Sequence, residues 1–243
     1  DANEARGHIF ADALFEAPGI GPFAGGEAGG ALRLSSDDTY RRRYDLGDED
    51  RLLSEAFLRR YGRTGYADLG ARYFQTLRED ERQDEIPFIL PEFRARRELE
   101  GWRGPGELAV EASGVGLFRR SGRDVSRATA AIDWEASGIV GPGLALRGFA
   151  LGRGDIYVNE DAEELDGGLG RLVPLAGLDA RFPLISTEGS ATHLIEPTAM
   201  AVVTPQGLNS EQIIDEDSRS VEFDEVNLFD PNRYPGFDRV EEG

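Results

Sequence analysis

Apolar and polar residues alternate along several stretches of the chain. Between Ser126 and Ser137 the even positions are apolar and most odd positions are polar or charged. The same alternation runs from Gly170 to Phe182 and from Glu107 to Gly116, and it is weaker from Ala191 to Thr204 because both faces are largely uncharged. A period of two residues indicates β-strands with two unlike faces.

Two other stretches fit more than one period. Asp48–Tyr61 could be a capped helix, with Leu52, Leu53, Ala56 and Phe57 on one face and Gly62 at its end. Tyr66–Leu77 fits a strand with apolar and polar faces, and it also fits a helix. Local pattern alone leaves both alternatives open for these two stretches.

The links between the periodic stretches alternate in character. Tight links rich in glycine or proline (62–65, 101–105, 138–142 and 186–189) alternate with longer acidic ones (37–50, 79–85, 154–168 and 205–243), and the glycine-rich link 17–29 is an exception. This arrangement predicts an antiparallel up-and-down meander with its tight turns at one end and its charged loops at the other. Residues 1–204 would form about ten strands, followed by a long acidic loop over 205–243. The expected strands are 6–16, 30–40, 51–62, 65–78, 86–99, 106–119, 126–137, 143–154, 170–184 and 190–204.

Such a meander, with one apolar face and one polar or small face on each strand, is typical of a transmembrane outer-membrane β-barrel. Hydrocarbon offers no hydrogen-bond partner to a peptide group, so spanning strands must pair until the sheet closes. The predicted fold is therefore all-β, an antiparallel meander forming part of a large barrel. The apolar face would contact lipid, the charges would face the lumen, and the segment 205–243 would be extracellular.

Composition narrows the possible functions. The formal net charge is −19, all 27 basic residues are arginines, and there is no cysteine. An acidic chain repels nucleic acid and anionic lipid, and the absence of cysteine excludes disulfides and thiolate metal sites. The longest stretch without charge, Pro197–Ser210, has 14 residues including two prolines, so no membrane-spanning helix is expected. No catalytic constellation stands out, and we expect neither an enzyme nor a cofactor.

The last part of the chain carries a series of short motifs. They are Asp215-Glu216-Asp217-Ser218, Glu222-Phe223-Asp224, Asn227-Leu228-Phe229, Asn232-Arg233 and Pro235-Gly236-Phe237-Asp238-Arg239. This order resembles the signature in the barrel domain of the LptD family of lipopolysaccharide-assembly proteins, in its alphaproteobacterial form. Stretches around Asp37–Leu52, Gln83–Glu92 and Leu194–Pro197 also look like that family.

The resemblance implies a barrel of many more than ten strands, of which this chain would be a middle portion, and it favours strands for the two ambiguous stretches. It implies delivery of lipopolysaccharide to the outer leaflet of the outer membrane of a Gram-negative cell. The implied partners are lipopolysaccharide, a lipoprotein that plugs the lumen, a periplasmic bridge protein and membrane lipid. It also makes Asn227, Phe229, Arg233, Pro235, Gly236, Asp238 and Arg239 the family-signature residues of the segment 205–243.

Two groups of residues are candidate sites. The arginines expected to face the lumen could bind phosphates of a passing glycolipid, or pair with nearby carboxylates: Arg72, Arg127, Arg171 and Arg181. Asp215, Asp217 and Asp224 could hold a divalent cation, or belong to a solvated loop. The competing hypothesis is a soluble all-β binding or adhesion module, in which the alternating faces form a sandwich core and a divalent cation contributes to binding.

Overall fold

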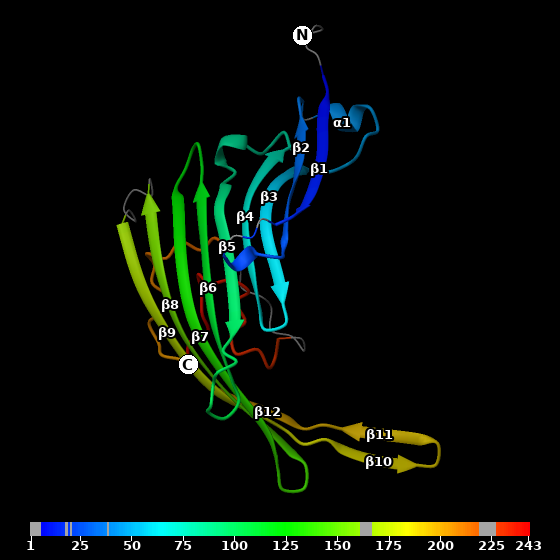
Figure 1. Cartoon of the computed structure of the whole chain (residues 1–243), viewed down its shortest axis with the longest axis vertical. Helices are drawn as coiled ribbons and strands as arrows, with labels where there is room; N and C mark the ends of the chain where they lie inside the picture. Colours follow the sequence, from blue (N-terminus) through cyan, green and yellow to red (C-terminus); the bar gives the residue numbers. More distant parts are fainter. Residues whose placement is uncertain (1–5, 18, 20, 38, 161–166, 219–226) are drawn as a thin grey trace. The chain divides into compact units, whose positions relative to one another are not determined.

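A computed structural model describes residues 6–17, 19, 21–37, 39–160, 167–218 and 227–243 (Figure 1). Ten strands form one antiparallel sheet in the order β1-β2-β3-β4-β5-β6-β7-β8-β9-β12, so the predicted meander is confirmed. A separate two-stranded sheet, β10-β11, lies between β9 and β12 in the sequence. The strands are β1 (His8–Glu16), β2 (Glu27–Ser35), β3 (Arg51–Gly62), β4 (Gly65–Thr76), β5 (Phe88–Glu98), β6 (Glu107–Phe118), β7 (Asp124–Val140), β8 (Leu144–Glu160), β9 (Gly167–Arg181), β10 (Leu184–Glu188), β11 (Ala191–Ile195) and β12 (Thr198–Val203).

The two ambiguous stretches are strands. β3 and β4 pair without interruption from Arg51 and Thr76 to Gly62 and Gly65, which leaves only residues 63 and 64 in the turn. A helix over the same residues would have lost this whole ladder of hydrogen bonds, so tertiary pairing decides between the two periods.

Two differences between the observed and the expected strand bounds lie in the last part of the sheet. β8 continues to Glu160, so Asp155 lies in a strand and not in the expected link 154–168. The expected strand 190–204 is divided into β11 and β12, and the β9-β12 pair bends where Phe182 N donates to Pro197 O at 3.0 Å. Pro183 and Pro197 lie at this bend, and proline cannot donate to a ladder.

The helices are short and belong to the links. They are η1 (Gly21–Phe23), α1 (Tyr40–Arg43) and η2 (Gln83–Glu85). α1 follows Ser35, the end of β2, because the Asp37 carboxylate accepts hydrogen bonds from the backbone N–H and the hydroxyl of Thr39, both at 2.8 Å, and turns the chain out of the expected strand 30–40. No helix in the described part of the chain is long and apolar enough to cross a membrane.

The chain divides into two compact units. The first comprises Asp1–Arg96, Ala112–Ala128 and Tyr157–Gly168. In its β1–β4 ladder, Phe15, Ala28, Leu58 and Leu69 are register partners on one face. Glu55 and Arg72 are partners on the other face and form an ion pair at 3.5 Å, while Arg72 also pairs with Glu92. One face of this unit is therefore apolar and the other carries paired charges.

The second unit comprises Arg97–Glu111, Thr129–Ile156 and Leu169–Gly243. Its β9 has Leu172 and Leu178 on one face, 68% and 50% exposed, while Arg171 and Asp179 on the other face are 8% and 3% exposed. Apolar side chains on the outside and charged ones in the interior reverse the pattern of a water-soluble core, as expected for a sheet whose apolar face contacts lipid.

The competing sandwich requires two sheets packed face to face. In the described residues the second sheet is only the β10-β11 hairpin, and ten strands belong to one sheet. A sandwich core is thus absent from the described structure, and the apolar faces stay exposed.

Candidate functional site

The polar face of β7, β8 and β9 in the second unit carries a buried charged network. The Asp155 side chain is fully buried, and Arg171 donates to its Oδ2 from Nε at 2.9 Å and from Nη2 at 2.7 Å. Thr129 Oγ1 donates to Asp155 Oδ1 at 2.9 Å, and Arg153 Nε lies 3.2 Å from the same oxygen. Three neighbouring strands are thus joined through one carboxylate.

Phe237 and Asp238, near the end of the chain, bind to this network. The Arg171 Nη1 group donates to the backbone carbonyl of Asp238 at 3.0 Å, and its Nη2 donates to that of Phe237. Arg153 also donates to the Phe237 carbonyl, at 3.2 Å, and its guanidinium lies 5.3 Å from the centre of the Phe237 ring. Two buried cations face one buried carboxylate, and the carbonyl dipoles of this segment complete their hydrogen bonding.

Within the segment, Asp217 and Asp238 bind each other's backbone. Asp217 Oδ1 accepts from the N–H groups of Phe237 and Asp238, at 3.0 and 3.1 Å. Asp238 Oδ2 accepts from the N–H groups of Glu216 and Asp217, at 2.9 and 3.1 Å. We call this reciprocal arrangement the aspartate clasp. It joins the first and last motifs of the family signature.

The neighbouring signature residues fit around the aspartate clasp. A Cβ atom on Gly236 would lie 2.1 Å from Asp217 Oδ1, so glycine is required there for the close approach. Asp215 Oδ1 accepts from Ser218 N at 2.8 Å, and Arg239 Nε lies 3.8 Å from Asp215 Oδ2. Short polar side chains therefore hold this turn together, beside the buried apolar residues Ile213, Ile214 and Val240.

The ends of the segment are also tied together. Thr204 and Gly243 exchange backbone hydrogen bonds at 2.8 and 3.2 Å. The Glu242 carboxylate accepts from the N–H groups of Gly207, Leu208 and Asn209, which lowers the pKa of Glu242 below its usual value. Asn209 in turn exchanges side-chain hydrogen bonds with the Val240 backbone, at 2.8 and 2.9 Å.

The remaining signature residues have different surroundings. Asn227 is buried, while Phe229 is partly exposed. Arg233 Nε donates to Glu241 Oε2 at 2.7 Å, and this bond raises the pKa of Arg233. In the sequence, Pro235 lies between Arg233 and Asp238 of the aspartate clasp.

The acidic residues named as cation ligands are placed as follows. Asp215, Asp217 and Asp238 each bring one oxygen within 4.8 Å of the others, and Asp224 lies outside the described residues. Oxygens of all three carboxylates accept backbone N–H groups, so the structure gives this cluster a role in folding the segment. The third member of the cluster is therefore Asp238, whereas the sequence suggested Asp224.

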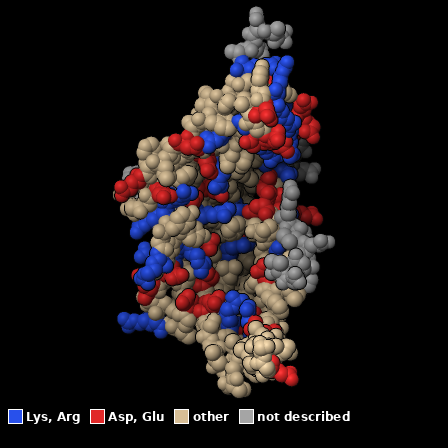
Figure 2. Space-filling model, turned by 90° about the vertical axis from the view of Figure 1, so that its right-hand side faces the viewer, with Lys and Arg blue, Asp and Glu red and all other residues tan. Residues whose placement is uncertain are grey.

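The four candidate arginines have different surroundings. Arg171 is 4% exposed at its side chain and held by Asp155, while Arg72 is one-third exposed and paired with Glu55 and Glu92. Arg127 is in β7 of the first unit. Arg181 is half exposed, with its Nε 3.0 Å from Asp179 Oδ1. Acidic and basic side chains are interspersed on the surface in Figure 2, as these pairs require.

Sequence reasoning missed Asp155, Thr129 and Arg153. The alternation through β8 would have revealed two of them, because Arg153, Asp155 and Tyr157 are odd-numbered like Arg147. Gly152 and Gly154 occupy positions of β8 where the alternation would place apolar residues, so the pattern does not show that the strand continues.

An antiparallel meander with an apolar outer face, a charged inner face and a segment folded onto the charged face defines a class, the outer-membrane β-barrel proteins. Comparison with family models narrows this class. The model of the LPS transport system D family, LptD, matches residues 28–243, which is most of the chain. The chain therefore belongs to the LptD family, a transport and assembly component for lipopolysaccharide at the outer membrane. No curated protein matches the chain.

Proposed function

We propose that this chain forms part of the wall of a barrel that delivers lipopolysaccharide to the outer leaflet of the outer membrane. The observation that carries this proposal is the contrast between faces: in β9, Leu172 is exposed while its neighbour Arg171 is buried against Asp155. The barrel would continue beyond these ten strands, and this chain would be a middle portion of it.

In this proposal the segment 205–243 is an extracellular loop that folds back into the lumen. It follows β12 at the strand end where the longer links lie, and in outer-membrane barrels the longer loops are extracellular. The Arg171 and Arg153 contacts with Phe237 would hold the loop against the wall and narrow the channel.

We propose the partners that the resemblance to the LptD family implies. A periplasmic bridge protein would hand over lipopolysaccharide at the end where the tight turns lie. A lipoprotein in the lumen would contact the part of the charged face of the sheet that the segment 205–243 does not contact. Exposed arginines such as Arg94, 57% exposed at its side chain and 3.3 Å from Glu92, would offer such contacts.

Photo-crosslinking from two adjacent residues of β7 tests the proposal. A photoreactive side chain at Asp133, on the charged face, should capture lipopolysaccharide only while its supply from the periplasm continues. The same group at Ile132, on the apolar face, should capture membrane lipid regardless of that supply. Equal dependence on supply at both positions would contradict the assignment of the faces.

A further inference from the structure

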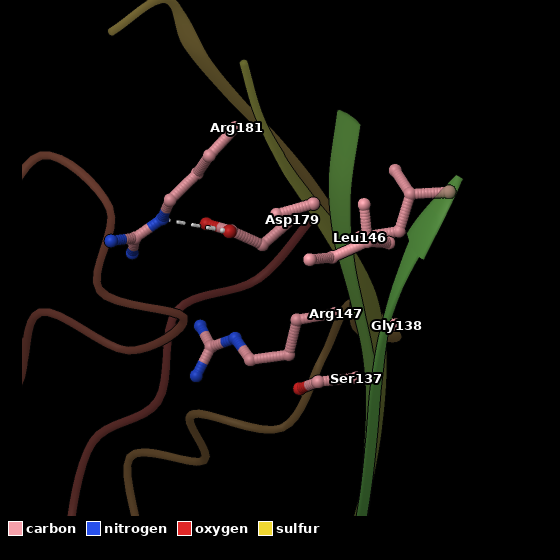
Figure 3. Close-up of a pocket in the computed structure, with 8 residues that line it drawn as sticks. Ser137, Gly138, Leu146, Arg147, Asp179 and Arg181 are labelled. Carbon is pink, nitrogen blue, oxygen red and sulfur yellow. Dashed lines mark hydrogen bonds and ion pairs between the residues drawn. The ribbon is translucent and has the colours of Figure 1, made fainter. Parts of the chain in front are cut away.

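A hollow lies on the polar face of the second unit, near the tight turn between β7 and β8. It encloses about 470 Å³ and is lined by Ser137 and Gly138 of β7, Leu146 and Arg147 of β8, and Asp179 and Arg181 of β9, among others (Figure 3). Gly141 and Gly143, both with positive φ, form the turn beside it. It is separate from the Asp155 network, which lies farther along the same strands.

Two arginines give the hollow its positive charge. Figure 3 shows the Arg147 and Arg181 side chains extending in the same direction from neighbouring strands, while Leu146 points the opposite way. The Arg147 side chain is 34% exposed and 3.5 Å from Glu135 Oε2, and that of Arg181 is 49% exposed. Both guanidinium groups keep accessible N–H donors, and paired guanidinium groups bind phosphate oxygens well.

A buried acceptor lies beside these donors. The Asp179 side chain is 4% exposed, and its Oδ1 accepts from Arg181 Nε at 3.0 Å. Its Oδ2 is buried and has no hydrogen-bond partner among the described residues. Buried carboxylate oxygens are almost always paired, so an unpaired one in a hollow indicates a ligand that brings a donor. Ser137 adds a hydroxyl at the rim.

We propose that this hollow binds a phosphorylated sugar, with its phosphate on Arg147 and Arg181 and a hydroxyl or ammonium group donating to Asp179 Oδ2. A bare phosphate would leave Asp179 Oδ2 without a donor, and a neutral sugar would leave the two guanidinium groups without an anion. This inference rests on the proposed function, since the sugar would be the headgroup of the transported glycolipid. At the end of the strands with the tight turns, the hollow would hold the headgroup at its entry to the barrel.

The test uses the outer-membrane protein in its native membrane, with a photoreactive side chain at Ser137. Lipopolysaccharide should be captured there, and the double change Arg147→Gln/Arg181→Gln should reduce capture about a hundredfold, roughly tenfold for each of the two charge-assisted contacts removed. Arg43→Gln removes an exposed arginine of α1, outside the hollow, and should leave capture unchanged. Heat-modifiable mobility on gels verifies that each variant folds, and Arg147→Lys/Arg181→Lys, which keeps the charge, should recover part of the capture.

Competitors separate the chemical parts of the ligand. Glucosamine 1-phosphate should compete with capture at Ser137, and glucosamine without phosphate should not. If inorganic phosphate competes as well as the sugar phosphate, the contact with Asp179 is refuted. An adduct with the mass of a soluble sugar phosphate would refute a glycolipid headgroup as the source.

A second photoreactive position distinguishes failure of this inference from failure of the proposed function. Capture at Asp133 without capture at Ser137 would refute the binding site and leave the transport role intact. Loss of capture at both positions would refute the transport role itself.

Discussion

Asp217 and Asp238 each accept two backbone N–H groups from the other's part of the chain, at distances between 2.9 and 3.1 Å. This relationship gives a physical reason for two motifs of the family signature. The two carboxylates join residues 216–217 to residues 237–238, and Arg171 binds the carbonyl of Asp238 from the wall of the sheet.

Asp238→Ala should release the segment from the wall. The change removes the acceptor for Glu216 N and Asp217 N, and charge-assisted hydrogen bonds contribute about 1.5–3 kcal/mol each. We expect the rate of limited proteolysis within 205–243 to rise by roughly two orders of magnitude. Asp230→Ala, at an exposed aspartate of the same segment, is the matched control and should not change the rate.

Gly236→Ala should also release the segment 205–243 from the wall, in this case through a steric clash. Its Cβ would lie 2.1 Å from Asp217 Oδ1 and 2.6 Å from the Asp217 carbonyl oxygen, and a backbone neighbour cannot move aside cheaply. Gly138→Ala adds a methyl group where no atom lies within 4 Å. Equal proteolysis rates for these two variants would show that the aspartate clasp does not need the close approach at Gly236.

The pair Asp155 and Arg171 should behave as a coupled unit. Asp155→Asn removes the carboxylate that Arg171 and Arg153 share, and Arg171→Met leaves Asp155 with Arg153 as its cation. Removing one member of a buried ion pair costs about 3–5 kcal/mol. The double variant should lose less than the sum of the two single losses. Urea unfolding midpoints of the barrel in detergent micelles measure this coupling. Additive losses would mean that the two side chains stabilise the sheet independently.

Local pattern was sufficient for part of the fold and insufficient for the site. Alternation identified the faces of β7 and β9, because nearly all the charged side chains of each strand lie on one side. It did not separate strand from helix in β3 and β4, where the pairing from Arg51–Thr76 to Gly62–Gly65 is decisive and is not a local property.

The aspartate clasp was beyond the reach of sequence reasoning for a related reason. Asp217 and Asp238 are 21 residues apart, and nothing in a run of acidic residues shows which carboxylates turn inward to backbone N–H groups. Three aspartates therefore suggested a cation site equally well. The sequence did indicate, through Arg171 and Arg181, the face on which both the Asp155 network and the hollow lie.

Leu172→Arg tests the assignment of the outer face. Leu172 is 68% exposed on the apolar face of β9, close to the middle of the strand, and an arginine near the middle of a bilayer costs about 2–4 kcal/mol in a barrel. We expect a marked decrease of the folded, heat-modifiable form in membranes. Asp133→Asn, on the charged face of β7, should assemble normally. If both variants assemble equally well, the apolar face does not contact lipid.

The link between β4 and β5 should lose stability in acid because of Glu81. Hydrogen bonds from Arg51 and Thr76 lower the pKa of Glu81 from 4.5 to about 2. A carboxyl group whose pKa is lower in the folded state stabilises that state above its unfolded pKa, and the contribution is lost as the pH falls toward the folded value. Protection of residues 77–87 from hydrogen exchange, compared with β3, should therefore decrease between about pH 4.5 and pH 2. Glu81→Gln removes the titrating group, so the protection of residues 77–87 in this variant should be lower at neutral pH and nearly independent of pH between about pH 4.5 and pH 2. An unchanged acid response in Glu81→Gln would assign the effect to another carboxylate of the link, such as Asp84, whose pKa Arg82 lowers.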